Sequence, residues 1–413
     1  MNDKEFFYRV LGLSEPWQVE DVKLDLAGKK VEVRVAVKAG TKWAEDGNLL
    51  PIAGYEERRW RHLDTMQLET IITAKVPRVA WIEEDEEEEA IKKTTKMVKV
   101  PWAEPGSRWT LAFEAFAIQV LLACGSTNEA AEWLRLDWRA VDRIMTRAVE
   151  RGLARRKLEQ MPYLGIDEKS FRKGHRYGSL LNDLEKGRVL EVVEHRTTAA
   201  AVMALETLPQ DVLGAVQAVA MDMSAAYASA VRKTCPQAEI VYDKFHVSAL
   251  LGQAVDEVRR EEHARLLARG DTTLKGTRYD WLFQPDNLSD DRLLSFKELV
   301  ERDLTTSKAW HHKTLFSEFW NQPCINTAKR FFDQWFKRAV RSKIKPVVAV
   351  AQTLQRHLIG LLAYIKHRIT NALSESLNSR IQTLKNNARG FHRFDSFRTR
   401  ILFFLGDLDL QPR

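Results

Sequence analysis

Cysteine is scarce in this chain of 413 residues, which contains only Cys124, Cys235 and Cys324. Because these thiols are widely spaced and odd in number, they do not predict a disulfide framework. The composition instead favours a reducing compartment, in which the three side chains serve only for packing. The class of small secreted domains held together by disulfides is therefore excluded.

Long hydrophobic runs are also missing. The first five residues already carry three charged side chains, and no long apolar segment follows them, which argues against a secretion signal. The most apolar later stretch, residues 358–365, is bounded by His357 and Lys366 and is too short to span a bilayer. We therefore expect a cytoplasmic protein without a membrane partner.

Basic residues outnumber acidic residues only slightly. The chain has 64 lysines and arginines against 57 aspartates and glutamates, which gives a net charge of +7 and a pI near 9.1. Such a balance suits a polyanionic partner only where the bases gather locally. The length allows a large core and predicts two or three domains.

The stretch Tyr163–Tyr177, reading YLGIDEKSFRKGHRY, places an acidic residue inside a short apolar run. Asp167 follows Leu164, Gly165 and Ile166 and would lie within a strand. An unpaired carboxylate is costly there unless a metal ion or a cation offsets its charge. This cost suggests a functional role for Asp167.

The segments after Asp167 alternate between strand and helix patterns. Strands are predicted at 177–182, 188–195, 216–221 and 239–242, and helices at 198–208 and 225–233. The third of these strands ends on Asp222, and the fourth runs into Asp243. This order matches a ribonuclease H-like α/β fold, in which acids from two neighbouring strands meet at one edge of a mixed sheet.

A third acid is then expected from a helix. Glu375 lies near the start of a predicted helix within a basic segment, which would bring DNA phosphates beside it. Asp243 is the competing candidate, because it also follows a strand. Each acid has an ordinary alternative role as well: Asp167 before a turn, Asp222 as a helix N-cap, and Glu375 as a first-turn charge.

Several ordered motifs resemble one protein family. The blocks GIDEKSFRKGHRY, AVAMDMSAAYASAV, VYDKFHV and TNALSESLN to ARGFHRFDSFRTRIL are similar to the DDE transposases of bacterial insertion sequences, specifically the ISL-three family. The resemblance continues upstream through YEERRWRHLDTMQLETIITAKVPRV and VPWAEPGSRWT and so covers most of the chain. It implies that Asp167, Asp222 and Glu375 hold two Mg²⁺ or Mn²⁺ ions and catalyse DNA strand cleavage and strand transfer.

The resemblance also implies partners. They are double-stranded DNA, in the form of the element's terminal inverted repeats and a target, and further copies of the chain in a homodimer or larger assembly on DNA. The location would be the bacterial cytoplasm, at the nucleoid. Two alternatives are an inactive or domesticated DNA-binding protein derived from a transposase, and a different nuclease of the same fold.

Residues 1–105 are predicted to form a small strand-rich domain. Members of the family carry paired cysteines around the block that matches RRWRHLD, as a structural zinc site, whereas this chain has no cysteine before Cys124. Zinc is therefore not expected, and stability is expected from the strands and from Trp43, Trp60 and Trp81. The acidic run Glu83–Glu89 is interpreted as a solvated loop, with a hard-cation site as the minor alternative.

Residues 106–158 are predicted to form a helix-turn-helix domain. Ser126 and Glu129 form a capping-box pattern, residues 136–138 make the turn, and a second helix follows. A plain helical hairpin is the alternative. The catalytic core would comprise 159–246 and 366–413, and a helical insertion with an aromatic core would occupy 247–365.

Basic residues from three regions are the candidate DNA contacts. The basic and aromatic segment 329–346 of the insertion could also lie against DNA. The individual candidates are Arg58, Arg59, Arg61, Arg139, Arg143, Lys385, Arg389 and Arg393.

Overall fold

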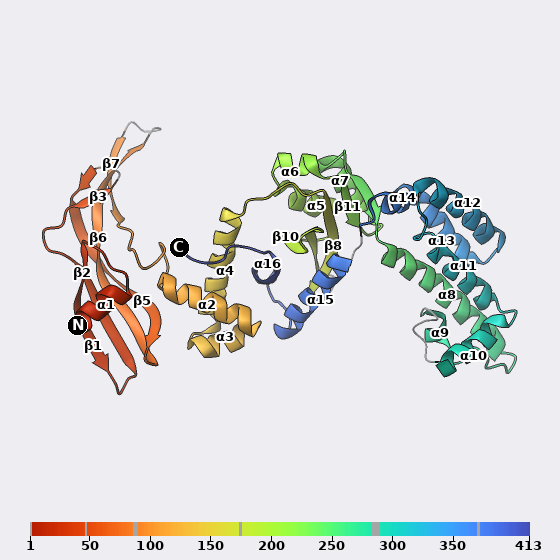
Figure 1. The fold of residues 1–413 in the computed structure, drawn as a ribbon, viewed down its shortest axis with the longest axis horizontal. Coiled ribbons are helices and arrows are strands. Elements are labelled where there is room, and N and C mark those ends of the chain that lie inside the picture. Colours follow the sequence, from red (N-terminus) through yellow and green to blue (C-terminus); the bar gives the residue numbers. More distant parts are fainter. Residues whose placement is uncertain (1, 46–47, 86–89, 173–175, 283–289, 370–371) are drawn as a thin grey trace. The chain divides into compact units, whose positions relative to one another are not determined.

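The computed structural model describes residues 2–45, 48–85, 90–172, 176–282, 290–369 and 372–413. It has a mixed α/β architecture, with a strand-rich amino-terminal region and a largely helical carboxy-terminal part (Figure 1). Two compact units divide the chain, 1–156 with 408–413 and 157–407. The sequence analysis placed 366–413 in one core, but the last six residues belong to the first unit.

The first unit contains a five-stranded sheet. Its strands are β1 (Trp17–Asp25), β2 (Lys30–Val37), β5 (Ile52–Thr65), β6 (Leu68–Asp85) and β7 (Ala90–Met97), in the order β1-β2-β6-β5 with β7 paired to β6. Helix α1 (Asp3–Val10) and the hairpin of β3 (Trp43–Glu45) and β4 (Asn48–Leu50) accompany it. The strict alternation in β2 buries one face of the strand, as the sequence pattern predicted.

Tryptophan rings fill the core of this sheet. Trp60 and Trp17 each pack edge-on against Trp102, with ring centroids 5.4 and 4.9 Å apart. Trp43 is partly buried against the same core. Two of the tryptophans expected to stabilise the region therefore do so, while the side chain of Trp81 and residues 86–89 of the acidic run lie outside the described part of the chain.

Three helices complete the first unit: α2 (Leu111–Cys124), α3 (Thr127–Leu134) and α4 (Trp138–Arg155). Ser126 is the N-cap of α3, but its side chain makes no capping hydrogen bond, so the predicted capping box does not form. Asp137 caps α4 by accepting a hydrogen bond from the Ala140 amide at 2.9 Å. The turn thus ends one residue earlier than predicted, at Asp137.

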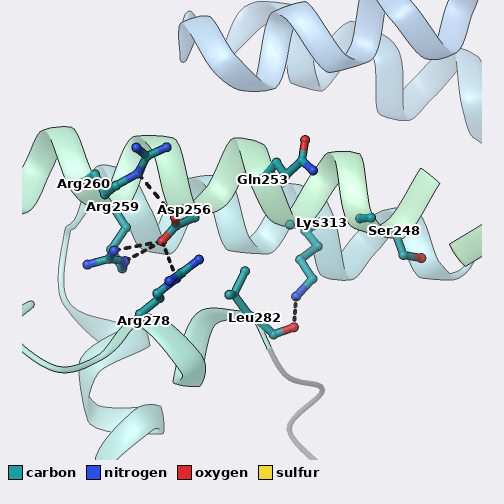
Figure 2. Close-up of a pocket in the computed structure, with 10 residues that line it drawn as sticks. Ser248, Gln253, Asp256, Arg259, Arg260, Arg278, Leu282 and Lys313 are labelled. Carbon is teal, nitrogen blue, oxygen red and sulfur yellow. Dashed lines mark hydrogen bonds and ion pairs between the residues drawn. The ribbon is translucent and has the colours of Figure 1, made fainter. Parts of the chain in front are cut away.

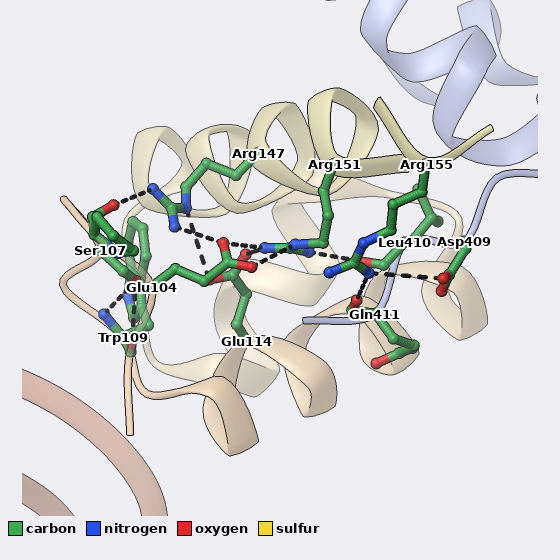
Figure 3. A network of polar contacts seen from close by, with 11 residues as sticks. Glu104, Ser107, Trp109, Glu114, Arg147, Arg151, Arg155, Asp409, Leu410 and Gln411 are labelled. Carbon is green, nitrogen blue, oxygen red and sulfur yellow. Dashed lines mark hydrogen bonds and ion pairs between the residues drawn. The ribbon is translucent and has the colours of Figure 1, made fainter. Parts of the chain in front are cut away.

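A buried ion-pair network holds these helices together (Figure 3). Arg151 of α4 donates to Glu104 through Nε and Nη2, both at 2.8 Å, and also to Glu114 of α2. Its Nη1 donates to the Leu410 carbonyl at 2.5 Å, which fastens the carboxy-terminal segment to the first unit. Glu114 and Arg151 are both buried, so each carboxylate depends on the guanidinium for its charge balance.

We predict that Arg151→Leu destabilises the first unit by about 3 kcal/mol, because it leaves the buried Glu114 without its main partner. Urea-induced unfolding followed by tryptophan fluorescence measures this change. The control is Arg413→Ala, whose exposed pair with Asp409 should contribute less than about 0.5 kcal/mol. If both variants lose less than about 0.5 kcal/mol of unfolding free energy, the prediction is contradicted.

The same network gives the first unit a pH dependence. Arg151 hydrogen bonding lowers the pKa of Glu104 below its ordinary value. The pair therefore contributes its full stability above the ordinary pKa and loses it as the pH falls through the lowered one.

The second unit is built on a mixed five-stranded sheet. Its strands are β8 (Tyr163–Arg172), β9 (Arg176–Asp183), β10 (Arg188–Glu194), β11 (Ala218–Met221) and β12 (Glu239–Tyr242), in the order β10-β9-β8-β11-β12. The first three form an antiparallel meander, whereas β11 pairs in parallel with both β8 and β12. Helices α5 (Thr198–Glu206), α6 (Gln210–Ala215) and α7 (Ala225–Thr234) connect them. The predicted order of elements is therefore confirmed except for α6, which was not predicted.

A helical region follows β12, and two further helices return to the sheet (Figure 1). Its helices are α8 (Lys244–Leu267), α9 (Arg278–Leu282), α10 (Asp290–Glu301), α11 (Thr305–Ser317), α12 (Ile325–Arg341), α13 (Lys345–Arg356) and α14 (Leu358–His367). Trp281, Phe316, Phe319, Phe332 and Trp335 are buried, which confirms the predicted aromatic core. Helix α15 (Ala372–Asn387) then packs on β8, and α16 (Phe394–Leu405) packs on β10.

None of the helices in the described ranges is both long enough and apolar enough to cross a membrane.

Candidate active site

The parallel pairing of β8 and β11 brings two acids together. Ile166 lies opposite Met221 in the register, so the next residues, Asp167 within β8 and Asp222 directly after β11, follow where the parallel pairing of the two strands ends. The carboxyl ends of parallel strands share one edge of a sheet, which is where α/β proteins place their sites. Asp222 is not the cap of the following helix, because Ser224 takes that position and accepts from the Tyr227 amide.

Gly165 allows α15 to approach this edge closely. A Cβ atom at Gly165 would lie 3.2 Å from Ser374 Oγ and 2.9 Å from a Leu184 methyl group. Any larger residue would therefore push the helix away from β8. Since side chains two apart in a strand point to the same face, Asp167 faces α15 as well.

Helix α15 contacts Asp167 directly. The side-chain amide of Asn378 donates to Asp167 Oδ2, and the Asn378 carbonyl accepts from Lys169 Nζ at 3.3 Å. Glu375 is exposed and lies in the first turn of the helix, three residues before Asn378. Residues three apart are neighbours on a helix face, so Glu375 lies one turn along from the contact with Asp167.

Asp222 belongs to a second group with Asp243 and His246. His246 Nδ1 lies 2.7 Å from Asp222 Oδ1 and 2.9 Å from Asp243 Oδ2. Asp243 is buried and also caps α8, because its Oδ1 accepts from the Phe245 amide at 2.9 Å. Among the residues that the structure describes, these three ligands lie within 4.8 Å of one another and could hold a metal ion.

The pKa shifts reflect this crowding of charge. Burial raises the pKa of Asp167, the Asn378 hydrogen bond opposes the shift, and the charge of Asp222 adds to it. Hydrogen bonds from His246 to Asp222 and Asp243 raise the pKa of its imidazole to about 10. These contacts favour the protonated imidazole, which compensates the two carboxylates.

The donor atoms fit a hard divalent cation. Asp167, Asp222 and Glu375 present carboxylate oxygens, which are the ligands that Mg²⁺ and Mn²⁺ prefer. The structure brings Asp167 and Asp222 to one edge and α15 beside them, but Glu375 is not part of the group around His246.

A cavity of about 540 Å³ opens beside Asp222 and His246. Arg196 lines it, donates to Glu168 Oε1 at 3.2 Å, and lies 4.4 Å from the centre of the Tyr177 ring. The sequence analysis identified neither Arg196 nor the contact of His246 with Asp222. The spacing of Asp243 and His246 on one helical turn was the available signal for the histidine.

The basic candidates in the first unit separate into two kinds. Arg61 is buried, donates to the His62 carbonyl at 2.5 Å and pairs with Asp64, so its selection as a DNA contact is corrected. Its guanidinium instead packs over the Phe113 ring. Arg58 is half-buried next to Glu56, and Arg59 is exposed.

Helix α4 presents the other two candidates of the first unit. Arg139 and Arg143 are exposed, and Arg139 lies over the ring of the exposed Trp138 at 5.6 Å. Arg147, further along the same helix, pairs with Glu104 at 2.8 Å. These arginines lie in similar sequence surroundings, but the structure separates the exposed Arg139 and Arg143 from the paired Arg147.

The carboxy-terminal bases are divided in the same way. Arg389 and Arg393 are exposed, whereas Lys385 is half-buried and donates to the Ser170 carbonyl at 2.5 Å. Arg398 pairs through two bonds with Glu191, at 2.7 and 2.8 Å, and Lys366 pairs with Glu239. Part of the predicted basic segment therefore stabilises the fold.

Comparison with known proteins corrects one expectation. Residues 50–80 match the zinc-finger of the transposases of IS204, IS1001, IS1096 and IS1165. The prediction that zinc is not expected is therefore wrong, since it rested on missing cysteines alone. In the structure these residues form most of β5 and β6, with His62 buried and bonded to Thr110 Oγ1 at 2.8 Å.

Two transposases are similar to this chain along much of their length. The transposase of insertion sequence IS1557 from Mycobacterium tuberculosis is 26% identical over 95% of this chain and 93% of its own length. That of IS1001 from Bordetella parapertussis is 27% identical over 68% of this chain and 70% of its own.

Family models agree with these relatives. Residues 98–149 match the helix-turn-helix domain of transposase family ISL3, so a DNA-binding domain occupies the place predicted for it. Residues 164–401 match the transposase domain of the same family and include all three candidate acids. Because this second match covers more than half of the chain, the protein belongs to the ISL3 family of DDE transposases, enzymes that cleave DNA and transfer its strands.

Proposed function

We propose that Asp167, Asp222 and Glu375 are the catalytic acids of a ribonuclease H-like core, formed by residues 159–246 and 366–407. The observation that carries this proposal is the parallel register of β8 and β11, which sets Asp167 and Asp222 side by side. The contact of Asn378 with Asp167 supports the third acid, because it seats α15 at the same edge.

The reaction we propose is cleavage at the terminal inverted repeats of an insertion sequence, followed by transfer of the freed 3′-hydroxyl to target DNA. The three acids would hold two Mg²⁺ or Mn²⁺ ions. Such ions, when bound, activate the attacking oxygen and stabilise the charge on the leaving oxygen. Neighbouring side chains of the protein orient these carboxylates.

Positioning is the role of the neighbouring side chains. Asn378 fixes the rotamer of Asp167 from α15, and His246 aligns Asp222 from α8. Asp243 acts indirectly, since it both caps α8 and orients His246. Supporting contacts of this kind hold reacting groups to the narrow geometry that catalysis needs.

We predict that Asp167→Asn and Asp222→Asn each abolish cleavage of repeat-end DNA in Mg²⁺ or Mn²⁺, because an amide is a poorer ligand for a hard cation. Binding of the same DNA should persist. The assay is nicking and strand joining of labelled DNA from the flanks of the native gene. Glu185→Gln, an exposed acid in the turn before β10, is the matched control and should retain activity. Cleavage by both Asn variants would contradict the assignment.

A second pair of variants identifies the third acid. We expect Glu375→Gln to eliminate metal-dependent strand transfer, and Asp243→Asn to reduce it less, because Asp243 is already committed to the α8 cap and His246. Strand-transfer rates at equal protein concentration make the comparison. Full activity of Glu375→Gln beside an inactive Asp243→Asn would assign the third position to Asp243.

We infer that α4 reads the repeat DNA. It is the second helix of the matched helix-turn-helix, and the exposed Arg139 and Arg143 lie on it one turn apart. Arg58, Arg59, Lys385, Arg389 and Arg393 are proposed as phosphate contacts. The protein would act on nucleoid DNA in the bacterial cytoplasm, as a homodimer or larger assembly that joins the two ends of the element.

We predict that replacing Arg139 and Arg143 together by Ala weakens binding to repeat DNA and lowers its salt slope by about 2, one for each lost phosphate contact. Fluorescence anisotropy at several salt concentrations gives both quantities. The control removes the same charge from exposed positions of the first unit, with Arg9→Ala and Arg413→Ala. Unchanged affinity and slope in the Arg139 and Arg143 variant would return the segment to a plain helical hairpin.

A further inference from the structure

A second cavity, of about 720 Å³, lies in the helical region, and four of its ten lining residues are basic. Its charged residues come from three helices: Asp256, Arg259 and Arg260 from α8, Arg278 from α9, and Lys313 from α11. Figure 2 shows the three guanidinium groups directed at the single carboxylate. Four cations surround one anion, so the cavity keeps an excess of positive charge.

The three arginines lie at different distances from the Asp256 carboxylate. Arg259 is buried and donates to its Oδ1 from Nε at 3.0 Å and from Nη2 at 2.8 Å. Arg260 and Arg278 lie farther away, at 3.3 and 3.7 Å, and their side chains are 66% and 57% exposed. Arg259 therefore balances the carboxylate, which leaves donors of Arg260 and Arg278 for another anion.

Lys313 adds a further donor beside them. Its Nζ donates to the carbonyls of Trp281 and Leu282, at 3.1 and 2.7 Å, and burial lowers its pKa to about 8. Those two contacts hold the ammonium group at the cavity, and Figure 2 shows the one with Leu282. An anion bound there would favour the charged form of the lysine.

This basic cavity is a neighbour of the cavity beside Asp222. Ala249 and Gln253 line both the cavity beside Asp222 and the cavity around Asp256. His246, Ala249 and Gln253 follow one another on successive turns of α8, and Arg260 lies two turns beyond Gln253. At about 1.5 Å per residue, Arg260 lies roughly 21 Å along the helix from His246, a length of about six base pairs of DNA.

We propose that the cavity formed by Arg259, Arg260, Arg278 and Lys313 binds a backbone phosphate of the DNA that is being cut, about six base pairs from the reacting phosphate. The ligand class is a phosphodiester, and α8 spans the distance between the two sites. The inference rests on the proposed function in one respect, that the cavity beside Asp222 receives the reacting DNA. It adds a contact outside the helix-turn-helix that positions the DNA within the second unit.

The test is binding of repeat-end duplex in the presence of EDTA, so that it does not depend on cleavage. Arg260→Gln with Arg278→Gln should weaken binding about tenfold and lower the salt slope by one to two. The matched control is Arg265→Gln with Arg269→Gln, which removes the same charge from exposed positions outside the cavity and should change both quantities much less. If the double variant loses thermal stability, the exposed Arg260→Gln alone replaces it.

Phosphate ethylation interference then locates the contact. In the parent protein and in the control, ethylation of a phosphate about six base pairs from the cleavage site should weaken binding, and in the double variant this effect should disappear. Equal affinity, salt slope and interference pattern in the double variant and the parent would overturn the inference. So would loss of inorganic phosphate binding without any change in DNA binding, because the cavity would then be a small-anion site.

The outcomes for this cavity and for the catalytic acids are separable. Weaker DNA binding by the double variant, together with a parent protein that never cleaves DNA, would support the phosphate contact and contradict the catalytic proposal. Normal cleavage by the parent and normal DNA binding by the double variant would do the reverse.

Discussion

The parallel pairing of β8 with β11 is the constraint on which the rest of the second unit depends. It sets Asp167 beside Asp222, and two neighbouring carboxylates repel each other unless something compensates them. Two helices supply the compensating groups. The Asn378 amide of α15 donates to Asp167, and the His246 imidazole of α8 lies against Asp222. Gly165 makes the first of these contacts possible because it leaves room for Ser374. The position of both helices therefore follows from the need to stabilise one pair of acids.

Helix α8 connects this pair to the helical region. Its first turn is fixed by Asp243, and further along it carries the arginines that surround Asp256. Glu262 of the same helix accepts the amides of Thr305 and Thr306, at 2.8 and 2.7 Å, and so caps α11, which bears Lys313. One long helix thus sets both the alignment of Asp222, a proposed catalytic carboxylate, and the shape of a basic cavity further along.

The first unit uses charge differently. Glu104, Glu114 and Arg151 are placed in its interior, where they join α2, α4 and the carboxy-terminal residues (Figure 3). The residues that match a zinc-finger model form long paired strands around Trp60, so the segment contributes to the same sheet and core. With these interior contacts made by Arg61, Arg147 and Arg151, the bases left on the surface of α4 are the ones suited to DNA.

Local pattern by itself determined the order of strands in the second unit, the acids within β8 and directly after β11, and the aromatic core of the insertion. These features depend on side-chain periodicity and on residues next to each other in the chain, so the sequence displays them directly.

Tertiary structure alone decided which basic side chains are paired with acids of the fold and which remain exposed. Arg61, Arg398 and Lys366 were indistinguishable in sequence from surface bases, yet each is paired with an acid of the fold. The contact of His246 with Asp222 and the approach of Arg278 to Asp256 were decided there too, because the packing of separate elements, rather than any local preference, brings such groups within a few ångströms. Arg259 and Arg260, by contrast, pair with Asp256 across one turn of the same helix.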